Sequence, residues 1–144
     1  MAGADKLYTP ELLALAVSLA SYPADPALPF HGEARSKSCG STLAIDLATD
    51  GDERIERFGL RVRACAVGQA SAAIFAGAAR GRSREEIDAT RRALSAWLGG
   101  EGSLPDWPGI EALVPARDFP ARHGAIMLPW TAAGDALSTA SADS

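Results

Sequence analysis

The chain has 144 residues, a length that suits one domain with a real hydrophobic core. Its 14 Lys and Arg face 18 Asp and Glu, and the resulting net charge of −4 argues against a general affinity for nucleic acid or anionic membranes. Two cysteines are too few for a secreted disulfide scaffold and indicate reduced thiols. The apolar N-terminal stretch follows Asp5 instead of a basic region and is too short to span a bilayer, so a cytoplasmic protein is expected.

The N-terminal third predicts one helix followed by a loop. Leucines recur at helical spacing between Thr9 and Tyr22, with Thr9 suited to the N-cap and Pro10 to the first turn. Three prolines then interrupt regular structure. Residues 30–38 are interpreted as a loop, with a short edge strand as the alternative.

A β-hairpin is predicted next. Apolar and polar residues alternate over residues 42–48, which is the period of a half-buried strand. Asp50-Gly51 is a hairpin turn signal, and residues 54–64 form the return strand. On that strand the inward residues are apolar, while Arg57, Arg61 and Arg63 face water.

Helices are predicted for most of the remaining chain. Small residues after Cys65 form a helix that ends at Gly77 or Gly81, and Ser83 with Glu86 forms a capping box for a helix that ends near Leu98. Residues 110–114 form at most a short helical turn. A last helix is expected from about residue 119, kinked at a proline and ending near residue 134. The predicted domain covers residues 1–137, and residues 138–144 are expected to form a disordered tail.

The hairpin brings the two cysteines toward one end of the sheet. If Asp50 and Gly51 are the two turn residues, Cys65 lies opposite Ser36, about 10 Å along the strand from Cys39. Cys65 also lies at the start of the small-residue helix, where free N–H groups and the helix dipole favour a thiolate.

Three interpretations of these thiols remain open at this point. A cysteine outside a motif is most often a buried small apolar residue. A disulfide between Cys39 and Cys65 is disfavoured in a cytoplasmic protein. A structural zinc site needs four ligands, and the pattern supplies only two cysteines.

Three motifs resemble the U-type iron–sulfur cluster assembly scaffolds, the IscU, SufU and NifU N-terminal family. The stretch "SKSCGS" at residues 36–41 is similar to that family's Asn-Pro-x-Cys-Gly-Asp motif, and "FGLRVRACAVGQASA" at residues 58–72 is similar to its second cysteine motif. The segment "GIEALVPARDFPARHGAIMLPW" at residues 109–130 resembles the closing segment of the SufU branch, and the long interval before it also resembles SufU.

The resemblance implies an α+β fold, in which a small antiparallel β-sheet has helices packed on one face, as in the SufE/NifU-like and IscU-like folds. It also implies a site at the end of the sheet, where three cysteines and an aspartate hold a transient [2Fe-2S] cluster or zinc. A cysteine desulfurase would supply sulfur as a persulfide. Thiolates suit both tasks, because they are soft ligands for iron and zinc and are the nucleophiles of persulfide exchange.

The chain departs from this ligand set at two positions. Cys39 and Cys65 match the first two cysteines, whereas Ser41 stands at the aspartate position and Ala125 at the third cysteine. One chain therefore lacks a complete zinc site. Two subunits could share one cluster, His123 could replace a ligand, or cluster assembly could be lost while the fold is kept. For His123 a solvated or capping role is favoured.

The resemblance thus implies a SufU-like scaffold that accepts sulfur and is not a turnover enzyme. Cys39 is the candidate persulfide acceptor, and Cys39 with Cys65 are the candidate ligands of iron or a transient [2Fe-2S] cluster, with zinc doubtful. The expected partners are a cysteine desulfurase and a second copy of the chain. The alternative is a paralogue without metal that binds the desulfurase or a cluster carrier. The outer arginines are either a docking surface or an ordinary solvated face, and the tryptophans are expected to pack in the core or an interface.

Overall fold

The computed structural model describes residues 7–37 and 40–143, and it contains one three-stranded antiparallel sheet with the strand order β1-β2-β3. The strands are β1 (Phe30–Arg35), β2 (Thr42–Thr49) and β3 (Ile55–Arg63). The α-helices are α2 (Pro10–Ser18), α3 (Ala66–Ala78), α4 (Arg84–Leu98) and α5 (His123–Asp143). The 3-10 segments are η1 (Leu19–Ser21), η2 (Ile110–Asp118) and η3 (Pro120–Arg122).

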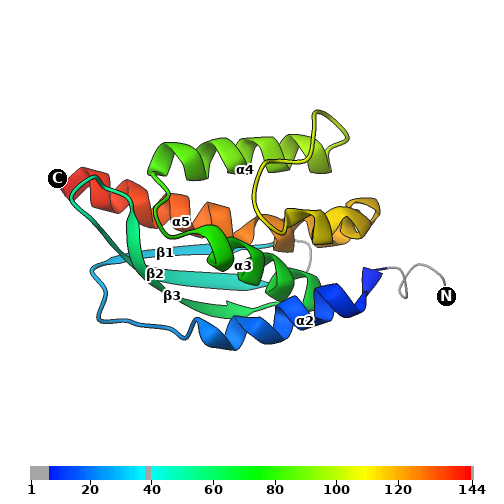
Figure 1. The fold of residues 1–144 in the computed structure, drawn as a ribbon, viewed down its shortest axis with the longest axis horizontal. Coiled ribbons are helices and arrows are strands. Elements are labelled where there is room, and N and C mark those ends of the chain that lie inside the picture. Colours follow the sequence, from blue (N-terminus) through cyan, green and yellow to red (C-terminus); the bar gives the residue numbers. More distant parts are fainter. Residues whose placement is uncertain (1–6, 38–39, 144) are drawn as a thin grey trace.

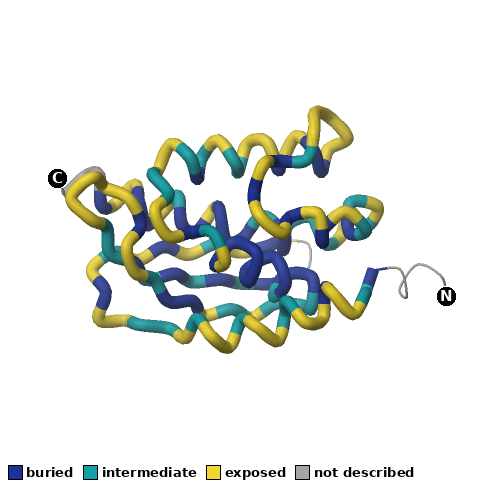
Figure 2. Tube along the Cα trace, viewed as in Figure 1, coloured by how far each residue is buried: buried dark blue, intermediate teal, exposed yellow. Residues whose placement is uncertain are grey.

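The helices form a layer against one side of the sheet (Figure 1). Helix α5 contacts β1 and β2, α3 contacts β3, α2 packs beside α3, and α4 packs on α5. The buried segments of the chain lie between these layers, along the strands and the facing helices (Figure 2). This arrangement confirms the predicted α+β class.

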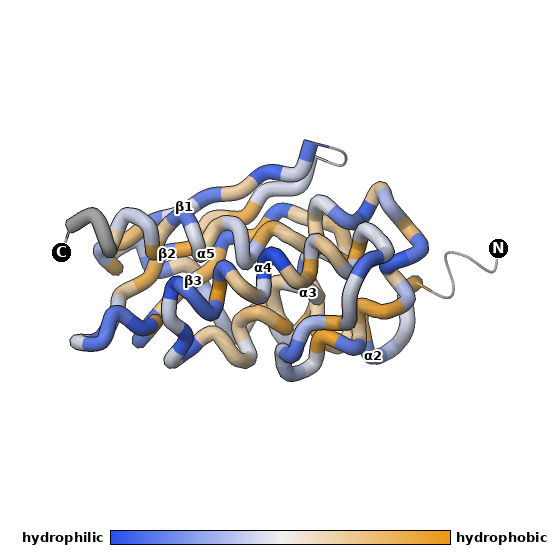
Figure 3. Tube along the Cα trace, turned by 90° about the horizontal axis from the view of Figure 1, so that it is seen from above, coloured by the Kyte–Doolittle hydropathy of each residue, from blue (hydrophilic) through white to orange (hydrophobic). Residues whose placement is uncertain are grey.

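Strand β2 is half-buried because its side chains alternate. Leu43, Ile45 and Leu47 are buried beneath the helices, whereas Thr42 and Ala44 on the opposite side are partly exposed. The hydropathy of the chain follows this division, with apolar residues concentrated between the sheet and the helices (Figure 3). A period of two residues therefore determines which side of the hairpin receives the helices.

The register of the hairpin differs from the sequence prediction. Thr42 pairs with Arg63, whereas a two-residue turn at Asp50-Gly51 would pair it with Gly59. The turn is longer because the backbone N–H of Asp50 donates to the Arg54 carbonyl at 2.9 Å. The Asp50 carboxylate also accepts bonds from the N–H groups of Asp52 and Arg54. Continuing this register by two residues sets Gly40 opposite Cys65. The sequence prediction set Ser36 there, so Cys65 lies nearer to position 39 than predicted.

Residues 30–35 form a six-residue strand where a loop was the preferred prediction. Phe30, Gly32 and Ala34 turn toward the helices, and His31, Glu33 and Arg35 are exposed. Strand β1 pairs with β2 along its full length. The alternative of an edge strand was therefore correct.

The aromatic residues pack in the helical layer. Phe75 stacks on Trp107 at 5.7 Å between ring centroids, and Trp130 meets Trp107 edge-on at 5.4 Å. The indole N–H of Trp107 donates to the Ile74 carbonyl at 3.0 Å. Trp97 is also buried. The tryptophans therefore serve core packing, as the sequence predicted.

Helix α4 begins with the predicted capping box, in which Ser83 and Glu86 bond each other's backbone N–H. Arg54 in the hairpin reaches Glu86 at 2.6 Å. This hydrogen bond is the largest of the interactions that lower the pKa of the Glu86 carboxyl below 4.5. The contact connects the turn of the hairpin to the start of α4.

Helix α5 is longer than predicted. It continues through Gly134 to Asp143, so residues 138–143, which were expected to form a disordered tail, are helical. No helix in the described part of the chain is long and apolar enough to cross a membrane.

Candidate functional site

The candidate site lies at the end of the sheet where β1 turns into β2. The turn is closed by the Ser36 N–H, which donates to the Ser41 carbonyl at 2.8 Å, and by the Gly40 N–H, which donates to the Ser36 carbonyl at 3.1 Å. Cys39 belongs to this turn in sequence but lies outside the described residues.

Cys65 is the N-cap of α3 and lies two residues after the end of β3. Its backbone is extended, with φ −65° and ψ 172°, and its side chain makes no capping hydrogen bond. The residue is partly buried and has no disulfide partner among the described residues. Because β3 pairs with β2, Cys65 emerges beside the turn that contains position 39.

Position 125 lies against the first turn of α3. A Cβ atom added to Gly68 would stand 3.2 Å from the Cβ of Ala125, and Gly68 is three residues after Cys65. Ala125 is fully buried near the start of α5. The position that matches the third family cysteine therefore lies one helical turn from Cys65.

A buried hydrogen bond holds α3 and α5 in this arrangement. The Ser71 hydroxyl donates to the Ile126 carbonyl at 2.6 Å, and Ser71 is fully buried. Ser71 belongs to the Ala-Ser-Ala segment that follows Cys65, but no sequence pattern indicates its partner 55 residues away.

Replacing Ser71 by Ala is expected to lower the free energy of unfolding by about 1–2 kcal/mol, because it removes a buried donor from the α3–α5 contact. Urea unfolding followed by circular dichroism measures the effect. Ser138→Ala on the exposed side of α5 is the control and should change stability by less than about 0.5 kcal/mol. Equal stability of the Ser71→Ala protein and the parent would contradict the assigned role.

The two other candidate residues are Ser41, which directly precedes β2, and His123, the first residue of α5. Ser41 is buried, with 4% of its surface exposed. The ring nitrogen Nε2 of His123 lies 2.8 Å from the Arg117 carbonyl, so this nitrogen is the donor of the bond. Such a bond orients a structural histidine, and it also orients a histidine that binds metal through its other nitrogen.

The described residues contain no group of three His, Cys, Asp or Glu side chains that could hold a metal ion. Within one chain, the neighbourhood of Cys65 offers Ala125 and Ser41 where carboxylate or thiolate ligands would be needed. Each chain can therefore supply two thiolates, and it lacks the other two ligands that a four-ligand site within one chain requires.

The chain was compared with protein-family models and with curated proteins, and neither comparison gave a match. Solved structures do match. The crystal structure of a nitrogen-fixing NifU-like protein (N-terminal) from Brucella abortus is 27% identical, with a TM-score of 0.87 and 99% of each chain covered.

A second solved structure is described as an iron–sulfur cluster assembly scaffold protein for the SUF system, from the thermophile Fervidobacterium islandicum AW-1. It is 18% identical, with a TM-score of 0.78, and the match covers 91% of this chain and 96% of that one. A hypothetical protein matches with a TM-score of 0.66 at 20% identity over 88% of this chain and 96% of that one. At these identities the two structures indicate a shared fold.

Proposed function

We propose that the chain, which has the fold of the U-type iron–sulfur scaffold proteins, is itself an iron–sulfur cluster assembly scaffold. Its ligand set is altered. The likeness to a NifU-like protein over 99% of each chain supports the family, and the resemblance of residues 109–130 to the SufU closing segment supports that branch. The protein would act in the cytoplasm as a sulfur acceptor, without turnover of a small-molecule substrate.

One observation carries the proposal. The turn at residues 36–41, the N-cap residue Cys65 and position 125 lie at the same end of the sheet, although they are far apart in sequence. These are the positions at which the family motifs have cysteines. This arrangement supports a site at that end of the sheet, with a ligand set that differs from the one in the family motifs.

Cys39 is proposed as the sulfur acceptor. Its thiolate would attack the terminal sulfur of a persulfide on the desulfurase, so that a new S–S bond forms on Cys39 and the desulfurase cysteine leaves as a thiolate. Cys65 would then hold iron beside it. Two copies of the chain would together supply the four thiolates that a [2Fe-2S] cluster requires.

Anaerobic reconstitution with iron, sulfide and a cysteine desulfurase tests the proposal. We expect visible cluster absorption, about two irons for every two chains, and a shift to a dimer in size-exclusion chromatography. The matched variants Cys39→Ser and Cys65→Ser should each abolish the absorption while retaining the melting temperature. A reconstituted protein that stays colourless and free of iron would rule out the shared cluster.

Ala125 and Ser41 favour a second candidate function, because neither side chain replaces the ligand that the family has there. In that case the chain is a paralogue without metal that binds the desulfurase or a cluster carrier. A colourless protein that still co-elutes with the desulfurase would support this candidate, and zinc would then also be absent from the purified protein.

A further inference from the structure

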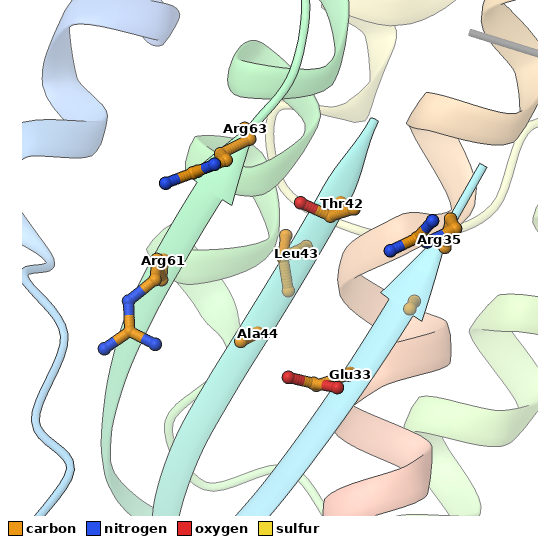
Figure 4. Close-up of a pocket in the computed structure, with 8 residues that line it drawn as sticks. Glu33, Arg35, Thr42, Leu43, Ala44, Arg61 and Arg63 are labelled. Atoms are coloured by element: carbon orange, nitrogen blue, oxygen red, sulfur yellow. The ribbon is translucent and has the colours of Figure 1, made fainter. Parts of the chain in front are cut away.

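The face of the sheet opposite the helices carries three exposed arginines near the candidate site. The pairing of the strands sets Arg35, Thr42 and Arg63 in one row across the sheet, and Glu33, Ala44 and Arg61 in the next row. Members of a row lie on the same face, because paired residues of antiparallel strands point to the same side. Figure 4 shows these side chains on the three strands.

These residues line a hollow of about 340 Å³ in the open face of the sheet. Thr42 and Ala44 lie on the central strand with their short side chains, between Glu33 and Arg35 on one edge strand and Arg61 and Arg63 on the other (Figure 4). Neighbouring strands are about 4.8 Å apart, so the backbones of Arg35 and Arg63 are about 10 Å apart across the hollow.

The three arginines, Arg35, Arg61 and Arg63, have no ion-pair partner within the part of the chain that the structure describes. Several other arginines of the chain do form ion pairs. The lining residues include one carboxylate, Glu33, on the edge strand opposite Arg61. The hollow is therefore a cationic area on a chain whose net charge is −4.

We propose that an acidic segment of a partner protein binds across this hollow. A compact anion would need donors that converge on one point, whereas the Arg61 and Arg63 side chains extend away from the central strand along β3 (Figure 4). A segment with several carboxylates can pair with guanidinium groups that are spread over two strands. Glu33 would orient the segment by keeping its carboxylates on the Arg61 side.

The segment would lie next to the candidate site, because Arg63 is two residues before Cys65 and Arg35 directly precedes the turn that contains position 39. The arginines carry their charge whether or not the chain holds a metal, so binding of an acidic segment does not depend on the cluster. Its failure would leave cluster binding untouched, and failure of reconstitution would leave this surface in place.

A fluorescein-labelled peptide of six glutamates serves as the probe in an anisotropy titration of the whole chain. The parent protein should bind it at low ionic strength and lose affinity as salt is raised to about 0.15 M, because the charges are exposed and become screened. The triple variant Arg35→Gln, Arg61→Gln, Arg63→Gln should bind the peptide about tenfold more weakly. It loses three exposed ion pairs with the peptide, and each of them contributes a small part of the binding free energy.

The matched control is the triple variant Arg80→Gln, Arg84→Gln, Arg92→Gln, which changes three other exposed arginines and so gives the same net charge. It should bind the peptide within about twofold of the parent. Glu33→Gln should bind more tightly, a gain that misfolding cannot produce. Equal weakening in the two triple variants, or no binding to the parent at low salt, would overturn the proposal.

Discussion

Replacing Ser41 by Asp and Ala125 by Cys in the same chain is expected to create a tight zinc site. With Cys39 and Cys65 the double variant has three thiolates and one carboxylate, which is the number of ligands that tetrahedral zinc takes. Complete structural sites of this kind bind zinc with about 10 kcal/mol or more of free energy at neutral pH. The unaltered chain, with two thiols, should bind zinc far more weakly.

The geometry around position 125 supports the exchange. Ala125 is fully buried, and its Cβ lies against Gly68 in the first turn of α3, the helix that Cys65 caps. Because Gly68 has no side chain, a thiol at position 125 would begin beside the start of that helix. Ser41 directly precedes β2, whose first residue Thr42 pairs with Arg63, two residues before Cys65.

Competition with a chromophoric chelator measures the zinc affinity of the double variant. The matched control combines Ser41→Asp with Ala133→Cys, which adds the same thiol to a buried position on α5 two turns away. Only the Ala125→Cys protein should bind tightly, and its affinity should fall with pH as protons compete for the thiolates. Equal zinc affinity in the two proteins would mean that position 125 does not belong to the site.

The hairpin and the helix starts could be predicted from the sequence because their signals are local. Leu43, Ile45 and Leu47 alternate with smaller or polar residues, and Ser83 precedes Glu86 by the three residues that a capping box requires. Both features appear as predicted. Neither depends on what the rest of the chain does.

Strand β1 was harder to predict because its inward residues are weakly apolar. Gly32 and Ala34 give little hydrophobic signal, and prolines precede the strand. Its pairing with β2 comes from the tertiary structure. Without that pairing, Arg35 could not be placed in the same row as Thr42 and Arg63, so the sequence alone indicated only part of the cationic face.

The predicted hairpin register was wrong because hydrogen bonds to a side chain lengthen the turn. Asp50 accepts two backbone bonds, and Glu53 adopts a positive φ of 61°. A two-residue turn signal cannot reveal this longer form. The same limit applies to the site, where the approach of Ala125 to Gly68 and the bond between Ser71 and Ile126 connect segments far apart in sequence.

Gly32→Ala is expected to destabilise the protein by about 3 kcal/mol or more, because α5 crosses β1 at this residue. A Cβ at position 32 would overlap the carbonyl oxygen of Ala132 and would stand 2.7 Å from the backbone nitrogen of Ala136. Both are backbone atoms of α5, so no side-chain rotation relieves the clash. The helix itself would have to move away from β1, and position 125 lies on that helix.

Urea unfolding compares this variant with Gly134→Ala, a second glycine exchange on the helix that Gly32 contacts. Gly134 lies within α5, and an added Cβ there meets no atom within 4 Å. Alanine has the higher helix propensity, so Gly134→Ala should be neutral or stabilising by up to about 1 kcal/mol. Opposite signs for the two variants would locate the close contact at the β1–α5 crossing, whereas a Gly32→Ala protein as stable as the parent would show that α5 does not rest on β1 as described.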